Sequence, residues 1–176
     1  MLAEKSFGRP TACNACPAFQ LAEWKLLPQS EIKTLTKTKR SKSYLPGETL
    51  FSAGDTCEGV FCIQDGRVGL WSLNLEGDIA LRYIFGPGEI VGLIDLVSNQ
   101  TYNMFCKAIN QTRACFIQKN LVKRLINEQP VLCAGFLKKT ASQIVNLEEF
   151  INDINYLPLK ARFCKLLTKL IMEYEE

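Results

Sequence analysis

The sequence contains no histidine among its 176 residues. This absence excludes Ser-His-Asp and Cys-His catalysis, the HExxH zinc site and histidine-ligated haem, because each of them needs an imidazole. The chain also lacks the GxSxG and GxxxxGK(S/T) motifs and any paired-carboxylate motif. We therefore expect a protein that is not an enzyme, and one in which only sulfur or carboxylate can hold a metal.

Long apolar runs and a strong charge imbalance are also missing. No stretch approaches the ~20 apolar residues of a transmembrane helix, and the segment Met1–Thr11 has no apolar core of a secretory signal. We therefore expect a cytoplasmic protein with reduced thiols and no membrane partner. The net charge of +3 is modest. The basic run Lys37–Lys42 is interpreted as a solvated edge, since no aromatic residues alternate with its charges.

Cysteine, in contrast, occurs eight times. In a reducing compartment, clustered cysteines indicate metal or redox chemistry more than disulfides. The segment Cys13-Asn-Ala-Cys16 has the spacing of a metal or redox motif. Four of the other cysteines are expected to act as small apolar side chains, namely Cys57, Cys62, Cys133 and Cys164.

Turn signals containing glycine divide residues 43–130 into short segments rich in β-branched and aromatic residues. The turns recur about every ten residues, which is typical of an antiparallel sandwich, barrel or roll. The segments that we expect to be strands are Thr49–Leu50–Phe51, Val60–Ile63, Val68–Trp71 and Leu81–Phe85. Before them, Ser30 is placed to cap a short helix.

Residues 131–155 are expected to form a long helix. Seven positions in this segment are separated by four and three residues in turn, which is the spacing of an a/d heptad seam. They are Cys133, Leu137, Thr140, Ile144, Leu147, Ile151 and Ile154. This narrow seam favours a parallel homodimer helix over a helix that only packs on the strands. Pro158 suits the first turn of a further helix, which has a broad apolar face.

Three motifs in the strand region carry a family resemblance. Pro46–Asp55, Asp65–Val68 and Gly88–Gly92 are similar to the start of the roll, the central hairpin and the ligand cassette of the Crp/Fnr family of transcription regulators. The resemblance implies an α+β fold: an antiparallel β-roll, the double-stranded β-helix of cyclic-nucleotide-binding domains, with short N-terminal helices and a long C-terminal dimerisation helix.

Four segments are expected on this basis. Residues 1–42 form a CxxC segment with short helices, 43–130 the β-roll sensor domain, 131–155 the dimerisation helix, and 156–176 the first helix of a missing or truncated DNA-binding domain. Members of the family end in a helix-turn-helix domain, which enters the major groove. DNA is therefore expected as a partner only if such a domain follows in the full-length protein.

The resemblance also allows the sensed ligand to be considered. Family members that bind cyclic nucleotides use a Glu just after the cassette glycine and an Arg-Ser pair further on, which hold the ribose and the phosphate. Here the first position is Leu93, and the pair falls near Tyr102-Asn103. Without these polar anchors, cyclic nucleotide is not the expected ligand.

The iron–sulfur oxygen sensors of the same family are the better match. Their pattern is Cys-x2-Cys-x5-Cys, with a fourth cysteine far downstream in the roll. Cys13 and Cys16 fit the first pair and Cys115 fits the downstream ligand, but Ala22 stands at the third position. The resemblance implies an iron–sulfur cluster of the 4Fe–4S type, and zinc is an alternative occupant of the same thiolates.

A local argument offers a ligand for the vacant position. If Asn110-Gln111 form a two-residue hairpin turn, Cys106 and Cys115 lie directly opposite each other, with Cβ atoms about 5 Å apart. Cys106 would then supply the fourth thiolate or form a disulfide with Cys115 under oxidation. Glu23 is a further candidate, because carboxylates also bind such clusters, though less commonly.

The sequence thus predicts the effector-sensing and dimerisation portion of a regulator. Oxygen or redox state would be sensed through a metal site on Cys13, Cys16, Cys115 and Cys106. The alternative is a module that binds a small ligand in the roll and whose cysteines are structural.

Overall fold

The computed structural model describes residues 12–74, 76–98 and 101–174. Contacts divide the chain into two compact units, Met1–Cys133 and Ala134–Glu176. The first unit contains the strands and the N-terminal turns, whereas the second contains most of one long helix and the helix that follows it. The expected fold class, an antiparallel β-roll with short N-terminal helices and a long C-terminal helix, is confirmed.

From residue 12 onward, where the description of the chain begins, three short 3-10 turns precede the first helix. They are η1 (Cys13–Ala15), η2 (Pro17–Gln20) and η3 (Glu23–Leu26), and α1 (Gln29–Thr38) follows. Pro28 is the N-cap of α1 and Ser30 lies inside its first turn, so the expected cap by Ser30 is wrong. Pro28 fixes the extended backbone that leads into the helix, and α1 buries Ile32 and Leu35.

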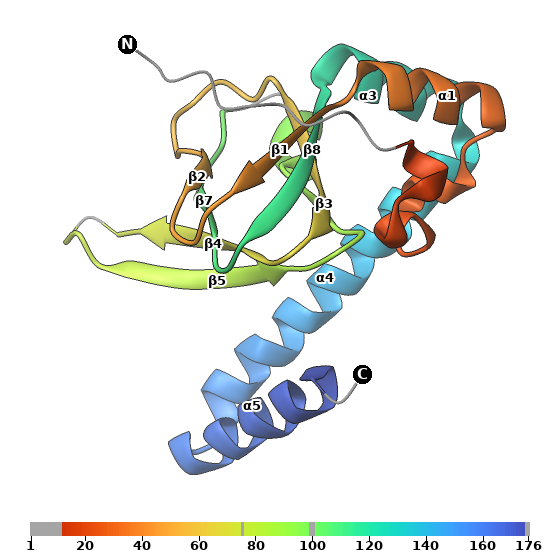
Figure 1. The fold of residues 1–176 in the computed structure, drawn as a ribbon. Helices are drawn as coiled ribbons and strands as arrows, with labels where there is room; N and C mark the ends of the chain where they lie inside the picture. Colours follow the sequence, from red (N-terminus) through yellow and green to blue (C-terminus); the bar gives the residue numbers. More distant parts are fainter. Residues whose placement is uncertain (1–11, 75, 99–100, 175–176) are drawn as a thin grey trace, which may run out of the picture. The chain divides into compact units, whose positions relative to one another are not determined.

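In the described part of the chain, eight strands form two four-stranded antiparallel sheets, and Figure 1 shows how they are arranged. The first sheet has the order β1 (Arg40–Tyr44), β8 (Thr112–Gln118), β3 (Gly59–Asp65) and β6 (Ile90–Val91). The second has the order β2 (Thr49–Phe51), β7 (Phe105–Ala108), β4 (Val68–Leu73) and β5 (Ile79–Phe85). The four strand segments expected from the sequence all fall within strands of the structure.

The inner face of the roll is built from alternating side chains of the two sheets. Phe61 of β3 contacts Phe51 of β2, with ring centroids 5.7 Å apart, so Phe61 faces the second sheet. Side chains alternate along a strand, and the neighbouring Cys62 therefore lies on the outer face of the first sheet. This outer face is where the N-terminal turns contribute to the site described below.

The chain passes from one sheet to the other between β7 and β8, so the predicted hairpin that pairs Cys106 with Cys115 is wrong. Both edges of β8 are occupied, by β1 and by β3. The connecting residues bind elsewhere: Asn110 accepts a hydrogen bond from the Arg67 backbone N–H through Oδ1 at 2.7 Å, and the N–H of Ile109 donates to the Arg67 carbonyl at 2.8 Å.

Four further helices are found among the described residues. They are α2 (Leu93–Val97), α3 (Lys119–Glu128), α4 (Pro130–Tyr156) and α5 (Leu159–Tyr174). The two helices expected near the C-terminus are therefore confirmed. Within the second unit, Lys165 of α5 and Asp153 of α4 form an ion pair at 2.7 Å. Among the helices that the structure describes, none combines the length and the apolar character needed to cross a membrane.

Candidate functional site

The turn that carries Cys13 and Cys16 is fixed by short-range bonds. The N–H of Cys16 donates to the carbonyl of Cys13 at 3.0 Å, which closes the 3-10 turn η1. Pro17 then starts η2, where its fixed φ suits a helical first position. The N–H of Cys13 donates to Thr36 Oγ1 at 3.1 Å, and this bond ties the turn to α1. The Cys-x2-Cys segment is therefore closed by one bond of its own and fixed to α1 by another.

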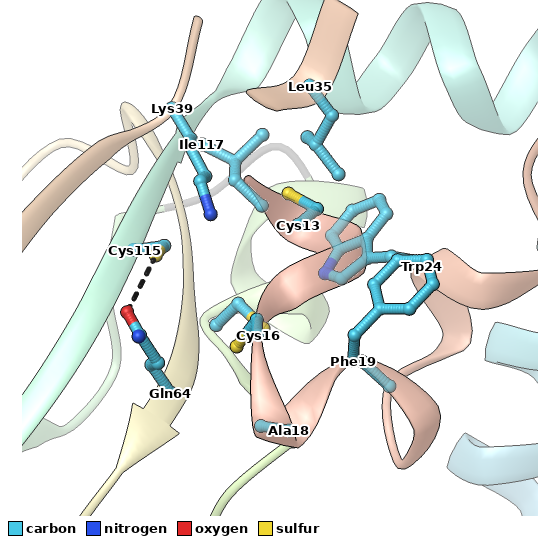
Figure 2. Close-up of a pocket in the computed structure, with 12 residues that line it drawn as sticks. Cys13, Cys16, Ala18, Phe19, Trp24, Leu35, Lys39, Gln64, Cys115 and Ile117 are labelled. Carbon is cyan, nitrogen blue, oxygen red and sulfur yellow. Dashed lines mark hydrogen bonds between the residues drawn. The ribbon is translucent and has the colours of Figure 1, made fainter. Parts of the chain in front are cut away.

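The first sheet contributes two more cysteines. Cys62 of β3 and Cys115 of β8 are directly opposite in the antiparallel ladder. Directly opposite residues have Cβ atoms about 4.5–5.5 Å apart and lie on the same face of the sheet. The Cys115 thiol also lies 3.8 Å from Gln64 Oε1, in hydrogen-bonding geometry (Figure 2).

These four cysteines line one pocket, a cavity of about 30 Å³ between the N-terminal turns, α1 and the first sheet. Figure 2 shows Cys13 and Cys16 on the turns and Cys115 on the strand facing them. The lining residues are Cys13, Cys16, Ala18, Phe19, Ala22, Trp24, Leu35, Lys39, Cys62, Gln64, Cys115 and Ile117. Sequence segments that are far apart thus bring thiols to one place.

Three of the four predicted site residues meet here, namely Cys13, Cys16 and Cys115. Cys106 does not line this pocket, because it belongs to β7 in the second sheet and is fully buried opposite Leu70 of β4. Glu23 is not among the lining residues either. Cys62, for which the sequence predicts a structural role, takes part in the pocket in place of Cys106.

The remaining cysteines lie elsewhere. Cys57 is fully buried and its thiol contacts the carbonyls of Gly59 and Gly92, so it behaves as the expected small core residue. Cys133 and Cys164, expected from the sequence to be small apolar side chains, are exposed on α4 and α5.

Lys39 supplies a positive charge inside the pocket. Its side chain is only 6% exposed and extends into the space between Cys13 and Cys115 (Figure 2). The interpretation of the basic run as a fully solvated edge is therefore wrong at this position. Burial lowers the pKa of Lys39, but the adjacent thiols of Cys115, Cys13 and Cys16 outweigh burial and raise the pKa overall. The ammonium group is thus a buried cation beside the thiols, and it opposes the effect of burial on the pKa of Cys115.

The two strand thiols are weak acids in this environment. Burial raises the pKa of Cys62 to about 12, and a hydrogen bond from Trp24 acts in the opposite direction. Burial also raises the pKa of Cys115, while Lys39 and a hydrogen bond from Ser41 lower it. Thiols of this kind are poor nucleophiles at neutral pH. Such thiols are still able to bind a metal ion, since a bound metal ion drives deprotonation of its thiol ligands.

The pocket residues have the donor set of a thiolate-bound metal group, although in the described part of the chain no three Cys, Asp or Glu side chains are arranged to hold a metal ion. A single zinc ion needs all its sulfurs at about 2.3 Å from one point. A cluster distributes its thiolates over several metal atoms, so its ligands stand further apart. The cavity would have to widen to admit a cluster, because a cavity of this size holds only about two water molecules, each of which needs about 10–15 Å³ by the same measure.

The region where family members hold cyclic nucleotides is filled differently. Tyr102 is 4% exposed, stacks on Phe51 with ring centroids 3.8 Å apart and donates its hydroxyl to the Gly59 carbonyl at 2.7 Å. Asn103 donates to the carboxylate of Asp95 from its side chain at 3.0 Å. The positions that would need to hold a phosphate therefore have an internal aromatic ring and an amide already bound to an acidic group.

The two antiparallel sheets, the glycine-punctuated turns and the long helix define a fold like that of cyclic-nucleotide-binding domains. The sequence profile of the family described as "Cyclic nucleotide-binding domain" matches residues 41–129, and the chain belongs to this family. The predicted recognition of the Crp/Fnr family is confirmed, because the named relatives include regulators of that group.

Two curated relatives are similar over most of this chain. One is the Anaerobic regulatory protein of Haemophilus influenzae, 23% identical over 171 residues that cover 97% of this chain and 66% of the relative. Another is the Fumarate and nitrate reduction regulatory protein of Vibrio cholerae, 24% identical over 148 residues that cover 84% of this chain and 59% of the relative. The chain thus spans less than two thirds of the length of these relatives.

Solved structures agree on the fold. The global regulator CLP of Xanthomonas campestris, which its description calls c-di-GMP responsive, is 16% identical with a TM-score of 0.73, covering 85% of this chain and 75% of that one. The Catabolite Activator Protein of Thermus thermophilus is 18% identical with a TM-score of 0.64, covering 76% of this chain and 62% of that one.

Proposed function

We propose that this chain is the effector-sensing and dimerisation portion of a Crp/Fnr-type transcription regulator, and that it senses oxygen or redox state through a thiolate-bound iron–sulfur site. The observation that carries the proposal is the meeting of Cys13, Cys16 and Cys115 at one pocket. The first two come from the N-terminal turn and the third from β8. The relatives named Anaerobic regulatory protein and Fumarate and nitrate reduction regulatory protein support the same proposal.

The residues of the chain would have distinct roles in such a site. The thiolates of Cys13, Cys16 and Cys115 would bind the metal group, and the ammonium of Lys39 would offset part of their negative charge. Apolar side chains around them, including Phe19, keep water out. A bound iron–sulfur cluster would supply the oxygen-labile, redox-active chemistry.

The turns that carry Cys13 and Cys16 would connect the site to the rest of the sensor. Since the cavity is small, loading would displace part of the covering turns η1 to η3, and loss of the metal group would let them close. A change of this kind would shift the equilibrium between two conformations of the domain, and such a shift can transmit a signal. We expect it to change the strength of the dimer contact proposed for α4.

Cyclic nucleotide sensing is disfavoured by the contacts of Tyr102 and Asn103. A small-ligand module with structural cysteines remains the second candidate, but a buried lysine beside several thiols favours the metal site. DNA binding is proposed for the full-length protein, if a helix-turn-helix domain follows α5. We propose no catalytic activity, in keeping with relatives that are named as regulators.

The decisive experiment is anaerobic purification followed by assays of iron, acid-labile sulfide and zinc per chain. The proposal predicts stoichiometric iron and sulfide with a visible absorbance band that disappears in air. Cys115→Ala should remove the band, whereas Cys106→Ala should retain it, because Cys106 is buried in the other sheet. Absence of both iron and sulfide from the wild-type chain contradicts the proposal, and zinc alone would replace the redox reading with a structural one.

A further inference from the structure

One thiol of the pocket has no counterpart in the Cys-x2-Cys-x5-Cys pattern. That pattern expects a cysteine where this chain has Ala22, and Ala22 is 1% exposed and lines the thiol pocket. A methyl group in that position gives no metal ligand. Three thiolates alone would leave one corner of a four-iron cluster without a protein ligand.

We propose that Cys62 supplies the fourth thiolate of the site, from β3, in place of the thiolate that the N-terminal segment lacks at Ala22. This inference rests on the proposed metal site and adds a ligand to it.

The register of the first sheet supports Cys62 directly. Cys62 and Cys115 are opposite residues of β3 and β8, and both lie on the outer face of the sheet. A ligand pair on two hydrogen-bonded strands is held at a fixed spacing, because the ladder leaves little freedom for either backbone. Cys62 is thus the cross-strand neighbour of Cys115, a proposed ligand, on the same face of the sheet.

The electrostatic environment agrees with this geometry. The four cysteines Cys13, Cys16, Cys62 and Cys115 line the same pocket, so their sulfurs share one apolar environment. The charge of Lys39 lies in the same pocket. In an apolar cavity, buried thiolates without a cation and a buried ammonium without an anion would each be destabilising. Four thiolates, the bound metal group and the ammonium of Lys39 would compensate part of one another's charge.

The other possible ligands are less suited. Cys106 belongs to the second sheet, and Cys57 contacts the carbonyls of Gly59 and Gly92. Cys133 and Cys164 are exposed, on α4 and α5. Glu23 is absent from the residues that line the pocket. Cys62 is therefore the remaining cysteine that meets Cys13, Cys16 and Cys115 within the described residues.

The test compares cluster loading in three variants of the full chain, reconstituted anaerobically with ferrous iron and sulfide. Cys62→Ala should bind less than about a fifth of the wild-type iron and sulfide. Cys57→Ala is the matched control, since it removes a buried cysteine of the same unit that lies outside the pocket, and it should load as the wild type does. The double variant Cys62→Ala, Ala22→Cys should regain most of the loading, because it moves the fourth thiolate to the position of the N-terminal pattern.

The outcomes separate this inference from the proposed function. If the wild type takes up no cluster, the proposed function fails and the inference fails with it. If the wild type loads and Cys62→Ala loads equally well, only the role of Cys62 is overturned. Far-UV circular dichroism checks that each variant is folded. Should Cys62→Ala not fold, rescue of both fold and loading by Ala22→Cys still supports the inference, and a folded double variant without a cluster contradicts it.

Discussion

Gly88 and Leu21 approach so closely that a Cβ atom on Gly88 would stand 2.5 Å from the Cβ of Leu21. Gly88 lies between β5 and β6, has a φ of +84° and donates its N–H to the Ile63 carbonyl at 2.8 Å. Leu21 follows η2, the turn after Cys16. The sheet and the segment that carries the N-terminal thiols are therefore in direct backbone-level contact, and this contact needs a residue without a side chain.

The first prediction tests this contact with Gly88→Ala. Alanine at positive φ costs about 1–2 kcal/mol, and the clash with Leu21 should add about 1–3 kcal/mol from overpacking. Gly54→Ala is the matched control, because Gly54 has a φ of +88° but a Cβ atom added to it would meet no atom within 4 Å. Urea unfolding measures both free energies. Equal destabilisation by the two variants would show that the Leu21 contact is unimportant.

The same pair of variants also probes the site. Displacement of Leu21 should disturb the turns that hold Cys13 and Cys16, so Gly88→Ala should bind less iron after anaerobic reconstitution, while Gly54→Ala binds the wild-type amount. A Gly88→Ala protein that is folded and fully loaded would indicate that the turns adapt without moving the thiols.

The second prediction concerns the buried charge of Lys39. Lys39→Met keeps much of the side-chain volume, and the cation that it removes is stabilised by the thiols but destabilised by burial, so the stability of the metal-free protein should change by less than about 1 kcal/mol. Metal loading should nevertheless fall several-fold, because the thiolates lose the positive charge that offsets theirs. A purely structural role for Lys39 would lower stability and loading together.

Lys37→Met is the control for Lys39→Met. Lys37 lies on α1, two residues before Lys39, but is exposed, so both its stability and its loading should equal those of the wild type. Thermal unfolding of the metal-free proteins and iron assays of the reconstituted ones provide the two measurements. Identical loading of Lys37→Met and Lys39→Met would rule out the charge-offset role.

The third prediction is that cyclic nucleotides do not stabilise this protein. A ligand present at 100 times its Kd stabilises the folded state by about 2.7 kcal/mol, which shifts Tm by several degrees. Because Tyr102 is bound to the Gly59 carbonyl and Asn103 to Asp95, at the positions where family members hold the phosphate, cAMP and cGMP at millimolar concentration should shift Tm by less than about 1 °C. A dose-dependent rise of several degrees would favour the small-ligand alternative.

The sequence was informative where the signal is local. Turn spacing and β-branched segments predict the strands, and heptad spacing predicts the long helix that the structure has as α4. The motif at Cys13 and Cys16 is likewise local, because four consecutive residues form it. Each of these inferences needs only neighbouring residues, so a single sequence is sufficient for it.

Two features of the site depend on long-range register, which a single sequence does not contain. Cys62 meets Cys115 because β3 and β8 pair with one particular offset. The two-residue hairpin assumed at Asn110-Gln111 led to Cys106 instead, since nothing local reveals that the chain changes sheets there. Lys39 was missed for a similar reason: burial of one lysine in a basic run depends on where α1 ends and on which elements surround that end.

The last prediction tests the dimer helix proposed for α4. Ile144 and Val145 are adjacent on this helix and almost equally exposed, at 53% and 52%, but only Ile144 belongs to the heptad seam. In a parallel dimer the seam is buried, so Ile144→Glu would place a carboxylate from each protomer in an apolar contact and should weaken dimerisation at least tenfold. Val145→Glu should leave the dissociation constant nearly unchanged.

Light scattering over a range of concentrations gives the mass of each variant, and circular dichroism shows whether α4 stays helical. The wild type and Val145→Glu should have the dimer mass at concentrations where Ile144→Glu is a monomer. Equal effects of the two substitutions would assign the contact to a broader face than the seam, and a monomeric wild type at all concentrations would contradict the dimer itself. Because the two residues are neighbours with similar exposure, a difference in dimer mass between their variants would report which face of α4 the partner protomer covers.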